Sequence, residues 1–192
     1  MKLLLHACCG PCSLEPVRLL AEAGHEVTLA FMNANIQPAD EYARRRDTLA
    51  AWAGAAGIPV VEGASDPTLW EAAVAPALAG PRQERCRACY RLRFEEVARV
   101  GAEGGFEAVS TTLSISPYQL TGVIAEELGR AAAAQGLACV FEDFRPFYPE
   151  ATRRSRALGM YRQNFCGCRP SADEAAAERA ERRRARKEGA GA

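Results

Sequence analysis

The chain has 192 residues, of which 48% are hydrophobic, so it is long enough for one globular domain with a sizeable core but short for two full domains. Its formal net charge is zero, so its overall charge does not indicate that it binds nucleic acid or membrane surfaces. The apolar start at residues 3–5 is too short for a signal peptide, and no apolar run is long enough to span a membrane. We therefore expect a cytoplasmic protein with no membrane partner.

Short apolar runs alternate with longer helical patterns along the chain. We predict strands over residues 2–6, 27–31, 58–61, 108–112 and 138–141. We predict helices over residues 13–23, 38–56, 66–79, 87–103 and 116–135, with Ser13 and Ser116 capping the first and the last of them. Strand and helix repeated at this spacing predict an α/β fold, an open and mostly parallel five-stranded Rossmann-like (HUP-like) sheet flanked by helices.

The last part of the chain differs in composition from the rest. After Pro170 it has almost no large apolar residues and therefore cannot bury a face. We predict one α/β domain over residues 1–170 and a charged tail over residues 171–192, which is either an exposed helix or disordered. The arginine triplets at residues 44–46 and 182–184 are expected on solvated helix faces.

Eight cysteines are many for a chain in a reducing compartment, where thiols usually bind metals or carry redox chemistry. Seven of them form three groups, which predict cysteine-rich loops at the carboxyl ends of the strands, where ligands bind in such folds. These candidate metal ligands are Cys8, Cys9, Cys12, Cys86, Cys89, Cys166 and Cys168. The eighth, Cys139, lies in the apolar stretch "LACVF", and we expect it to be a buried small hydrophobic residue.

Seven clustered thiols exceed the four ligands of an ordinary zinc site. We therefore expect two metal centres, or one metal centre beside a redox-active cysteine pair. Thiolate ligation indicates iron–sulfur or zinc, and a cluster with only three protein ligands would leave one iron open for chemistry. A zinc clasp that ties loops together is the structural alternative. No glycine-rich phosphate loop or pyrophosphatase loop follows the first strand, so we expect no ATP.

Two arginine-rich stretches adjoin the cysteine pairs. Residues 82–93 contain five arginines and one acid, and residues 151–172 contain five arginines and no acid. Arginine side chains match phosphate geometry and stack on bases. One interpretation is therefore that these stretches bind a polyanionic substrate and bring its reactive part to the metal. Solvated helix faces are the alternative. The candidate substrate contacts in the second stretch are Arg153, Arg154 and Arg162.

Several motifs together resemble a known family in order and spacing. These are "HACCGPCS", "NANIQPADEY", "RCRACYRLR", "STTLSISPY" and "MYRQNFCGC", which resemble the QueH family of epoxyqueuosine reductases from about residue 3 to residue 170. The resemblance implies a cytoplasmic oxidoreductase of tRNA modification. Its reaction is the two-electron reduction of the epoxide of epoxyqueuosine, at the wobble position of the tRNA anticodon, to queuosine, the last step of queuosine biosynthesis.

The resemblance also implies the cofactors. Family members look like cobalamin-independent iron–sulfur enzymes, so residues 1–170 would be a catalytic domain with a 4Fe-4S cluster, a second mononuclear iron and an external electron donor. The residues that match the family's metal-site cysteines are Cys8, Cys9, Cys86, Cys89, Cys166 and Cys168. Position 12, often Asp in relatives, is Cys12, a softer ligand. Where the family usually has "SPHK", residues 116–119 are "SPYQ", so this loop lacks a titratable imidazole and an ammonium group. Where the family has "NPNIHP", residues 33–38 are "NANIQP".

The implied reaction needs a Lewis acid for the epoxide oxygen and a proton for the departing oxygen. We name Tyr161 and Tyr42 as candidate proton donors, although either could be a half-buried structural tyrosine. Candidate contacts to substrate hydroxyls are Thr111, Thr112, Ser114 and Ser116. The alternative function is a zinc-stabilised RNA-binding module without redox catalysis. A tRNA sulfur-transfer enzyme would need ATP, and the missing pyrophosphatase loop argues against it.

Overall fold

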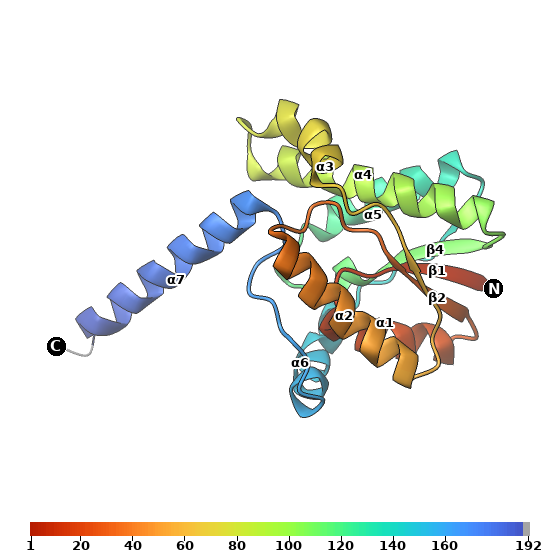
Figure 1. Ribbon diagram of the computed structural model, residues 1–192, viewed down its shortest axis with the longest axis horizontal. Coiled ribbons are helices and arrows are strands. Elements are labelled where there is room, and N and C mark those ends of the chain that lie inside the picture. Colours follow the sequence, from red (N-terminus) through yellow and green to blue (C-terminus); the bar gives the residue numbers. More distant parts are fainter. Residues whose placement is uncertain (190–192) are drawn as a thin grey trace.

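A computed structural model describes residues 1–189 of the chain. Its centre is a parallel sheet of five strands in the order β3-β2-β1-β4-β5 (Figure 1). The strands are β1 (Lys2–His6), β2 (Glu26–Phe31), β3 (Val60–Glu62), β4 (Ala108–Thr111) and β5 (Ala138–Cys139). The strand order reverses between β1 and β4, and such a switch point opens a crevice beyond the carboxyl ends of these two strands. The predicted open parallel sheet is confirmed.

Helices cover both faces of the sheet (Figure 1). They are α1 (Gly10–Glu22), α2 (Ala39–Ala55), α3 (Pro67–Val74), α4 (Arg82–Glu103), α5 (Thr121–Ala134), α6 (Tyr148–Ala157) and α7 (Arg169–Gly189), with short 3-10 turns η1 (Ala75–Ala77), η2 (Thr112–Ile115) and η3 (Arg145–Phe147). One face carries α1, α2 and α6, and the other carries α4 and α5. No helix in the described part of the chain is long and apolar enough to cross a membrane.

The side chains of β1 alternate between two apolar layers. Leu4 packs toward α4 and α5 in a core that includes Phe94 and Val109. Leu3 and Leu5 pack on the opposite side, toward α1 and α2. Because both faces of β1 are covered, its sequence is a continuous apolar run, as expected for the central strand of a parallel sheet.

Helix α1 begins three residues before the predicted start. Cys9 is its N-cap and Gly10-Pro11 is its first turn, so the prediction that Ser13 caps this helix is wrong. The physical reason is Pro11, whose fixed φ and missing N–H suit the first helical turn. Ser13 instead lies inside the helix and donates a hydrogen bond to the Cys9 carbonyl oxygen at 2.8 Å. The earlier start places Cys9 and Cys12 at the N-terminal end of α1.

Helix α5 starts at Thr121, and the prediction that Ser116 caps it is also wrong. The chain after β4 first forms η2, where the Thr111 side chain accepts a hydrogen bond from the Leu113 N–H. Ser116 ends that turn, and its hydroxyl oxygen accepts from the Tyr118 N–H at 3.3 Å. A fixed loop over residues 116–120 therefore separates β4 from α5.

Two further differences concern Cys139 and helix α6. Cys139 is exposed, contrary to the prediction, because β5 has only two residues and lies at the edge of the sheet. Helix α6 was not predicted at all, and it packs closely against α1.

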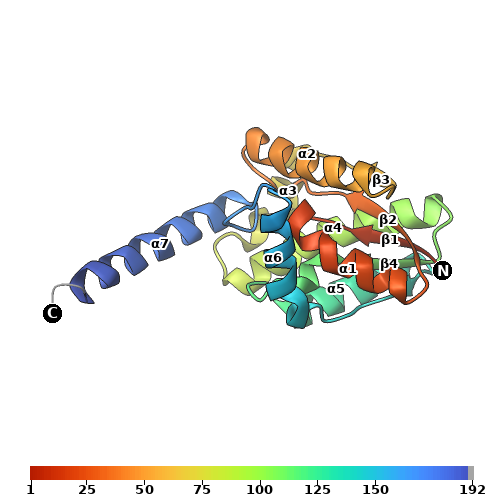
Figure 2. The same ribbon diagram turned by 90° about the horizontal axis from the view of Figure 1, so that it is seen from below.

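Helix α7 covers most of the predicted tail and extends away from the sheet and its covering helices (Figure 2). Residues 190–192 of the predicted tail lie outside the described residues.

Candidate metal centre

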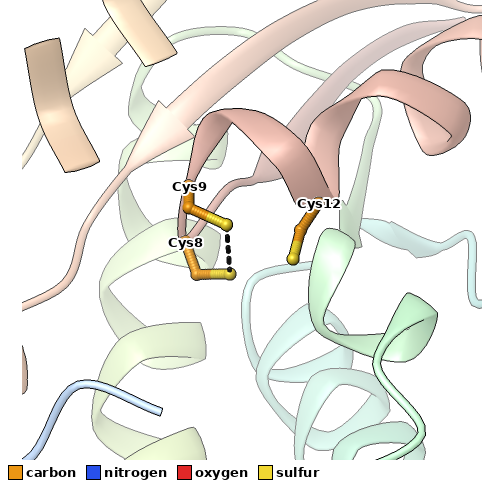
Figure 3. Close-up of side chains that lie close together, drawn as sticks. All are labelled: Cys8, Cys9 and Cys12. Carbon is orange, nitrogen blue, oxygen red and sulfur yellow. Dashed lines mark hydrogen bonds between the residues drawn. The ribbon is translucent and has the colours of Figure 1, made fainter. Parts of the chain in front are cut away.

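Three thiols gather beyond the carboxyl end of β1 (Figure 3). The sulfur atoms of Cys8, Cys9 and Cys12 all lie within 4.8 Å of one another, and the Cys8 and Cys9 sulfurs are 3.8 Å apart. Cys8 lies in the loop after β1, whereas Cys9 and Cys12 belong to the start of α1. The positive end of the helix dipole favours thiolates here. This three-thiol set has the geometry to hold one metal ion.

The protonation of the three-thiol set is unequal. Hydrogen bonds from Cys12 and Cys9 hold the pKa of Cys8 well below its usual range. Burial raises the pKa of Cys9 to about 12. The pKa of Cys12 is also well above its usual range, chiefly because of its hydrogen bond with Cys8. Because thiolates are the metal-binding form, a metal ion that binds this set would displace the protons that its thiols hold.

Four further thiols line a second pocket, although they come from distant parts of the sequence. Cys86 and Cys89 lie on one face of α4, and Cys166 and Cys168 flank Gly167 in the loop that leads into α7. Burial raises the pKa of Cys86 and of Cys166, and it raises the pKa of Cys89 to about 12. The structure thus divides the seven clustered cysteines into a three-thiol set and a four-thiol set.

Arg93 connects the two sets. It is fully buried on α4, and one of its guanidinium nitrogens donates to the Asn33 side-chain oxygen at 2.6 Å. Its positive charge contributes to the lowered pKa of Cys8, and it partly offsets the burial that raises the pKa of Cys89. Sequence reasoning missed this residue, yet its spacing of four from Cys89 places both on one helix face.

The surroundings of the four-thiol set test whether a metal–sulfur group fits. Among the described residues, the buried donors without a hydrogen-bond acceptor include Trp70 Nε1, Arg85 Nε and two nitrogens of Arg93. Trp70 and Arg85 line the pocket with the four thiols. Buried donors almost always have acceptors, and the sulfides of an iron–sulfur cluster accept hydrogen bonds. Four thiols beside unsatisfied donors therefore fit an anionic metal–sulfur cluster.

A buried arginine on α2 holds the loop that carries Cys166 and Cys168. Arg45 donates to the Cys166 carbonyl oxygen at 2.8 Å and to the Phe165 carbonyl oxygen at 3.1 Å. Its Nε donates to the Glu41 carboxylate at 2.7 Å, and both side chains are buried. The prediction of a solvated face is therefore wrong for Arg45. This arginine points toward the cysteine loop, whereas Arg44 is exposed and Arg46 is partly exposed.

Gly167 allows this loop to approach its neighbours closely. Its φ is +138°, and an added Cβ would lie 2.9 Å from Asn35 Nδ2 and 3.0 Å from Ile36 Cγ1. We expect Gly167→Ala to destabilise the protein by about 1–3 kcal/mol and to lower its metal content, because the loop must move. Thermal unfolding and iron content after reconstitution measure these effects.

Gly159 provides the matched control for this prediction. It also has positive φ, +62°, but an added Cβ would meet nothing within 4 Å. Gly159→Ala is expected to cost only about 1 kcal/mol and to keep its metal. Equal losses of stability and metal in the two variants would contradict the close approach at Gly167.

Of the predicted substrate hydroxyls, Thr112 lies beside Cys8, and the protein itself engages Thr111, Thr112 and Ser114. The Thr112 hydroxyl accepts from the Cys8 N–H at 3.5 Å and lies 3.9 Å from the Cys8 sulfur. The Thr111 hydroxyl is 3.0 Å from His6 Nδ1, and Ser114 donates to the Thr111 carbonyl oxygen. All three are buried. They position the backbone around Cys8.

The two predicted proton donors lie on α2 and near it. The Tyr161 hydroxyl donates to the Glu41 carboxylate at 2.5 Å, in the network that holds Arg45. The Tyr42 ring packs edge-on against Phe31, with ring centroids 5.1 Å apart. Neither tyrosine lines the two pockets beside the thiols.

The predicted arginine contacts have partners within the protein. Arg153 pairs with Glu150 at 2.6 Å, and Arg154 pairs with the buried carboxylate of Glu15 at 2.5 Å. Arg162 donates to the Thr152 carbonyl oxygen at 2.9 Å and lines the pocket beside Cys12.

Each thiol set also has one glutamine that sequence reasoning missed. Gln163 donates from Nε2 to the Cys9 sulfur at 2.8 Å, and its buried Oε1 has no partner within the described residues. Gln119 donates to the Cys166 sulfur at 3.4 Å and accepts from the Tyr90 hydroxyl at 2.6 Å. Amide hydrogen bonds to thiolate sulfurs help to set the potential of iron–sulfur sites.

Comparison with known proteins places this centre in a family. The family described as "Epoxyqueuosine reductase QueH" matches residues 3–174, which include all seven clustered cysteines. A protein named epoxyqueuosine reductase QueH from Histophilus somni is 32% identical over 87% of this chain and 70% of its own length. One of the same name from Thermotoga maritima is 33% identical over 86% of this chain and 87% of its own length.

A solved structure shares the fold. The predicted subunit of a tRNA methyltransferase from Methanocaldococcus jannaschii is 13% identical, with a TM-score of 0.52 over 82% of this chain and 76% of that protein. This likeness supports the Rossmann-like architecture alone. The family match spans the sheet, the crevice and both thiol sets, and the chain belongs to the QueH family of epoxyqueuosine reductases.

Proposed function

We propose that the protein is an epoxyqueuosine reductase that acts on tRNA and reduces the epoxide of epoxyqueuosine to queuosine, with electrons from an external donor. The observation that carries the proposal is the meeting of three thiols and four thiols on either side of buried Arg93, in a chain of this family. The three-thiol set directly follows β1, at the switch point of the sheet, where α/β folds bind their ligands.

We assign a 4Fe-4S cluster to the four-thiol set and a second, mononuclear iron to the three-thiol set. Four cysteine thiolates are the usual ligands of such a cluster, whereas three thiolates leave a coordination position open on a single iron. When bound, the cluster supplies electrons one at a time, and the iron supplies a Lewis acid for the epoxide oxygen. The proposal uses no cobalamin.

The chain itself provides a pocket beside the three-thiol set. It is lined by Pro11, Cys12, Ile115, Tyr148, Ala151, Thr152, Arg162 and Gln163. A substrate group that enters this pocket lies beside Cys12 and Gln163, which both line it. The tyrosine available here is Tyr148, so we propose it, rather than Tyr161 or Tyr42, as the group that gives a proton to the departing oxygen.

Anaerobic purification followed by two measurements tests the proposal. The first is the iron, sulfide and zinc content, for which we expect about five irons and about four sulfides per chain. The second is incubation with tRNA that carries epoxyqueuosine and with dithionite as electron donor. The expected product is queuosine, recognised by mass spectrometry through the loss of one oxygen atom. Zinc without iron after reconstitution, together with an unchanged epoxide, would overturn the proposal.

A further inference from the structure

Tyr118 is an exposed aromatic side chain at the entrance to both thiol sets. It is 66% exposed, the largest exposed fraction of any large hydrophobic side chain in the described part of the chain. Its ring meets that of Tyr148 edge-on, with centroids 6.3 Å apart and planes at 84°. Tyr148 in turn lines the pocket that contains Cys12. The aromatic pair therefore leads from the surface to the three-thiol set.

The backbone around Tyr118 is fixed even though its ring is exposed. Its N–H donates to the Ser116 hydroxyl oxygen at 3.3 Å, and its carbonyl oxygen accepts from Arg82 at 2.9 Å. The next residue, Gln119, is held between the Tyr90 hydroxyl and the Cys166 sulfur. A ring held in place in this way loses little conformational entropy when a ligand stacks on it.

Arg82 adds a positive charge at the same place. The side chains of Arg85, Arg87 and Arg91 in the same stretch of α4 pair with carboxylates. Arg82 is exposed and has no carboxylate partner within the described residues, and it lines the pocket with Cys86. Its guanidinium is therefore available to an external anion, next to the exposed ring of Tyr118.

We infer that Tyr118 and Arg82 form a docking element for single-stranded RNA. Tyr118 stacks on a base next to the reacting nucleotide, and Arg82 contacts a phosphate of the same strand. RNA loops expose both groups at once, since unstacked bases meet aromatic rings while arginine matches the phosphate. The inference rests on the proposed function, because it places the anticodon loop across the entrance to both thiol sets.

Binding of the metal-loaded protein to an anticodon stem-loop RNA tests the inference, with fluorescence anisotropy measured over a series of salt concentrations. Tyr118→Ala is expected to weaken binding about 5- to 150-fold with an unchanged salt slope, because stacking is lost and no charge is removed. Tyr118→Phe and Tyr118→His keep an aromatic face and should bind nearly as the wild type does. Arg82→Gln is expected to weaken binding and to reduce the salt slope by about one.

Matched controls separate docking from folding and from chemistry. Leu158→Ala removes another exposed apolar side chain, and Arg99→Gln removes an exposed arginine on the same helix, so both should leave binding unchanged. All variants should keep wild-type iron content and thermal stability. Unchanged binding in Tyr118→Ala, equal losses in the alanine and phenylalanine variants, or no binding by the wild type would overturn the inference.

The same experiment distinguishes this inference from the proposed function. If the wild type reduces the epoxide but Tyr118→Ala leaves both RNA affinity and the KM for tRNA unchanged, the docking element is wrong and the reductase assignment stands. If RNA binding depends on Tyr118 but the loaded protein never reduces the epoxide, the docking element stands and the reductase assignment fails.

Discussion

Cys86→Ala is expected to reduce the sulfide content to background, to lower the iron content from about five to about one per chain, and to abolish the reductase activity. Cys86 is one of four thiols that line a single pocket, so its loss leaves an incomplete ligand set next to donors that require an acceptor. The side chain is only partly buried, so the fold itself should survive the truncation. Iron and sulfide analysis of the anaerobically reconstituted variant, with circular dichroism to verify folding, measures the effect.

Cys139→Ala is the control for this experiment. Cys139 is the one cysteine outside both thiol sets, on the exposed edge strand β5. The variant is expected to keep its full iron content and activity. A Cys86→Ala protein with normal iron content would contradict the assignment of the four-thiol set, whereas loss of iron in Cys139→Ala would show that any missing thiol has the same effect.

Arg45→Met is expected to destabilise the protein by about 3 kcal/mol, because it removes the buried cation 2.7 Å from the buried Glu41 carboxylate and leaves only the longer pair with exposed Arg44, at 3.7 Å. It also removes both hydrogen bonds to the carbonyl oxygens of the cysteine loop. Chemical denaturation of the metal-free protein measures the loss, so that a secondary loss of metal cannot account for it. Adding Glu41→Gln to the variant should recover part of the stability, because the buried charge is removed.

Arg46→Met is the matched control for this second prediction. Arg46 is the adjacent arginine, and it pairs with exposed Asp47 at 2.8 Å. Surface pairs of this kind contribute about 0–1 kcal/mol, and the substitution should have a correspondingly small effect. Similar small losses in both variants would show that Arg45 does not hold the loop.

The sheet could be predicted from sequence because its central strands are short runs rich in apolar and β-branched residues, separated by longer helical patterns. Helix α6 could not, because its buried face consists of small residues, Ala151 and Ser155, and gives no apolar periodicity. The starts of α1 and α5 were misplaced for a different reason. A serine before a helical pattern is a common cap, but at Ser13 and Ser116 the neighbouring prolines and turns decide the local structure.

The candidate site was predicted as a set of cysteines but not as an arrangement. Spacing identifies the thiols, whereas their division into three and four depends on which loops meet in space. Arg45 and Arg93 were missed because arginine in a helical sequence usually indicates solvent. Here burial is possible because each has a partner, Glu41 for Arg45 and Asn33 for Arg93. The glutamines at the thiols gave no signal in the sequence.

The four-thiol set joins α4 to the loop before α7, and this has a consequence for biosynthesis. During translation Cys8, Cys9 and Cys12 are made first, then Cys86 and Cys89, and Cys166 and Cys168 last. Gln163, which contacts the Cys9 sulfur, is also made late. A nascent chain thus exposes thiols long before either set is complete, and neither set can bind its full complement of metal until residues 163–168 have been translated.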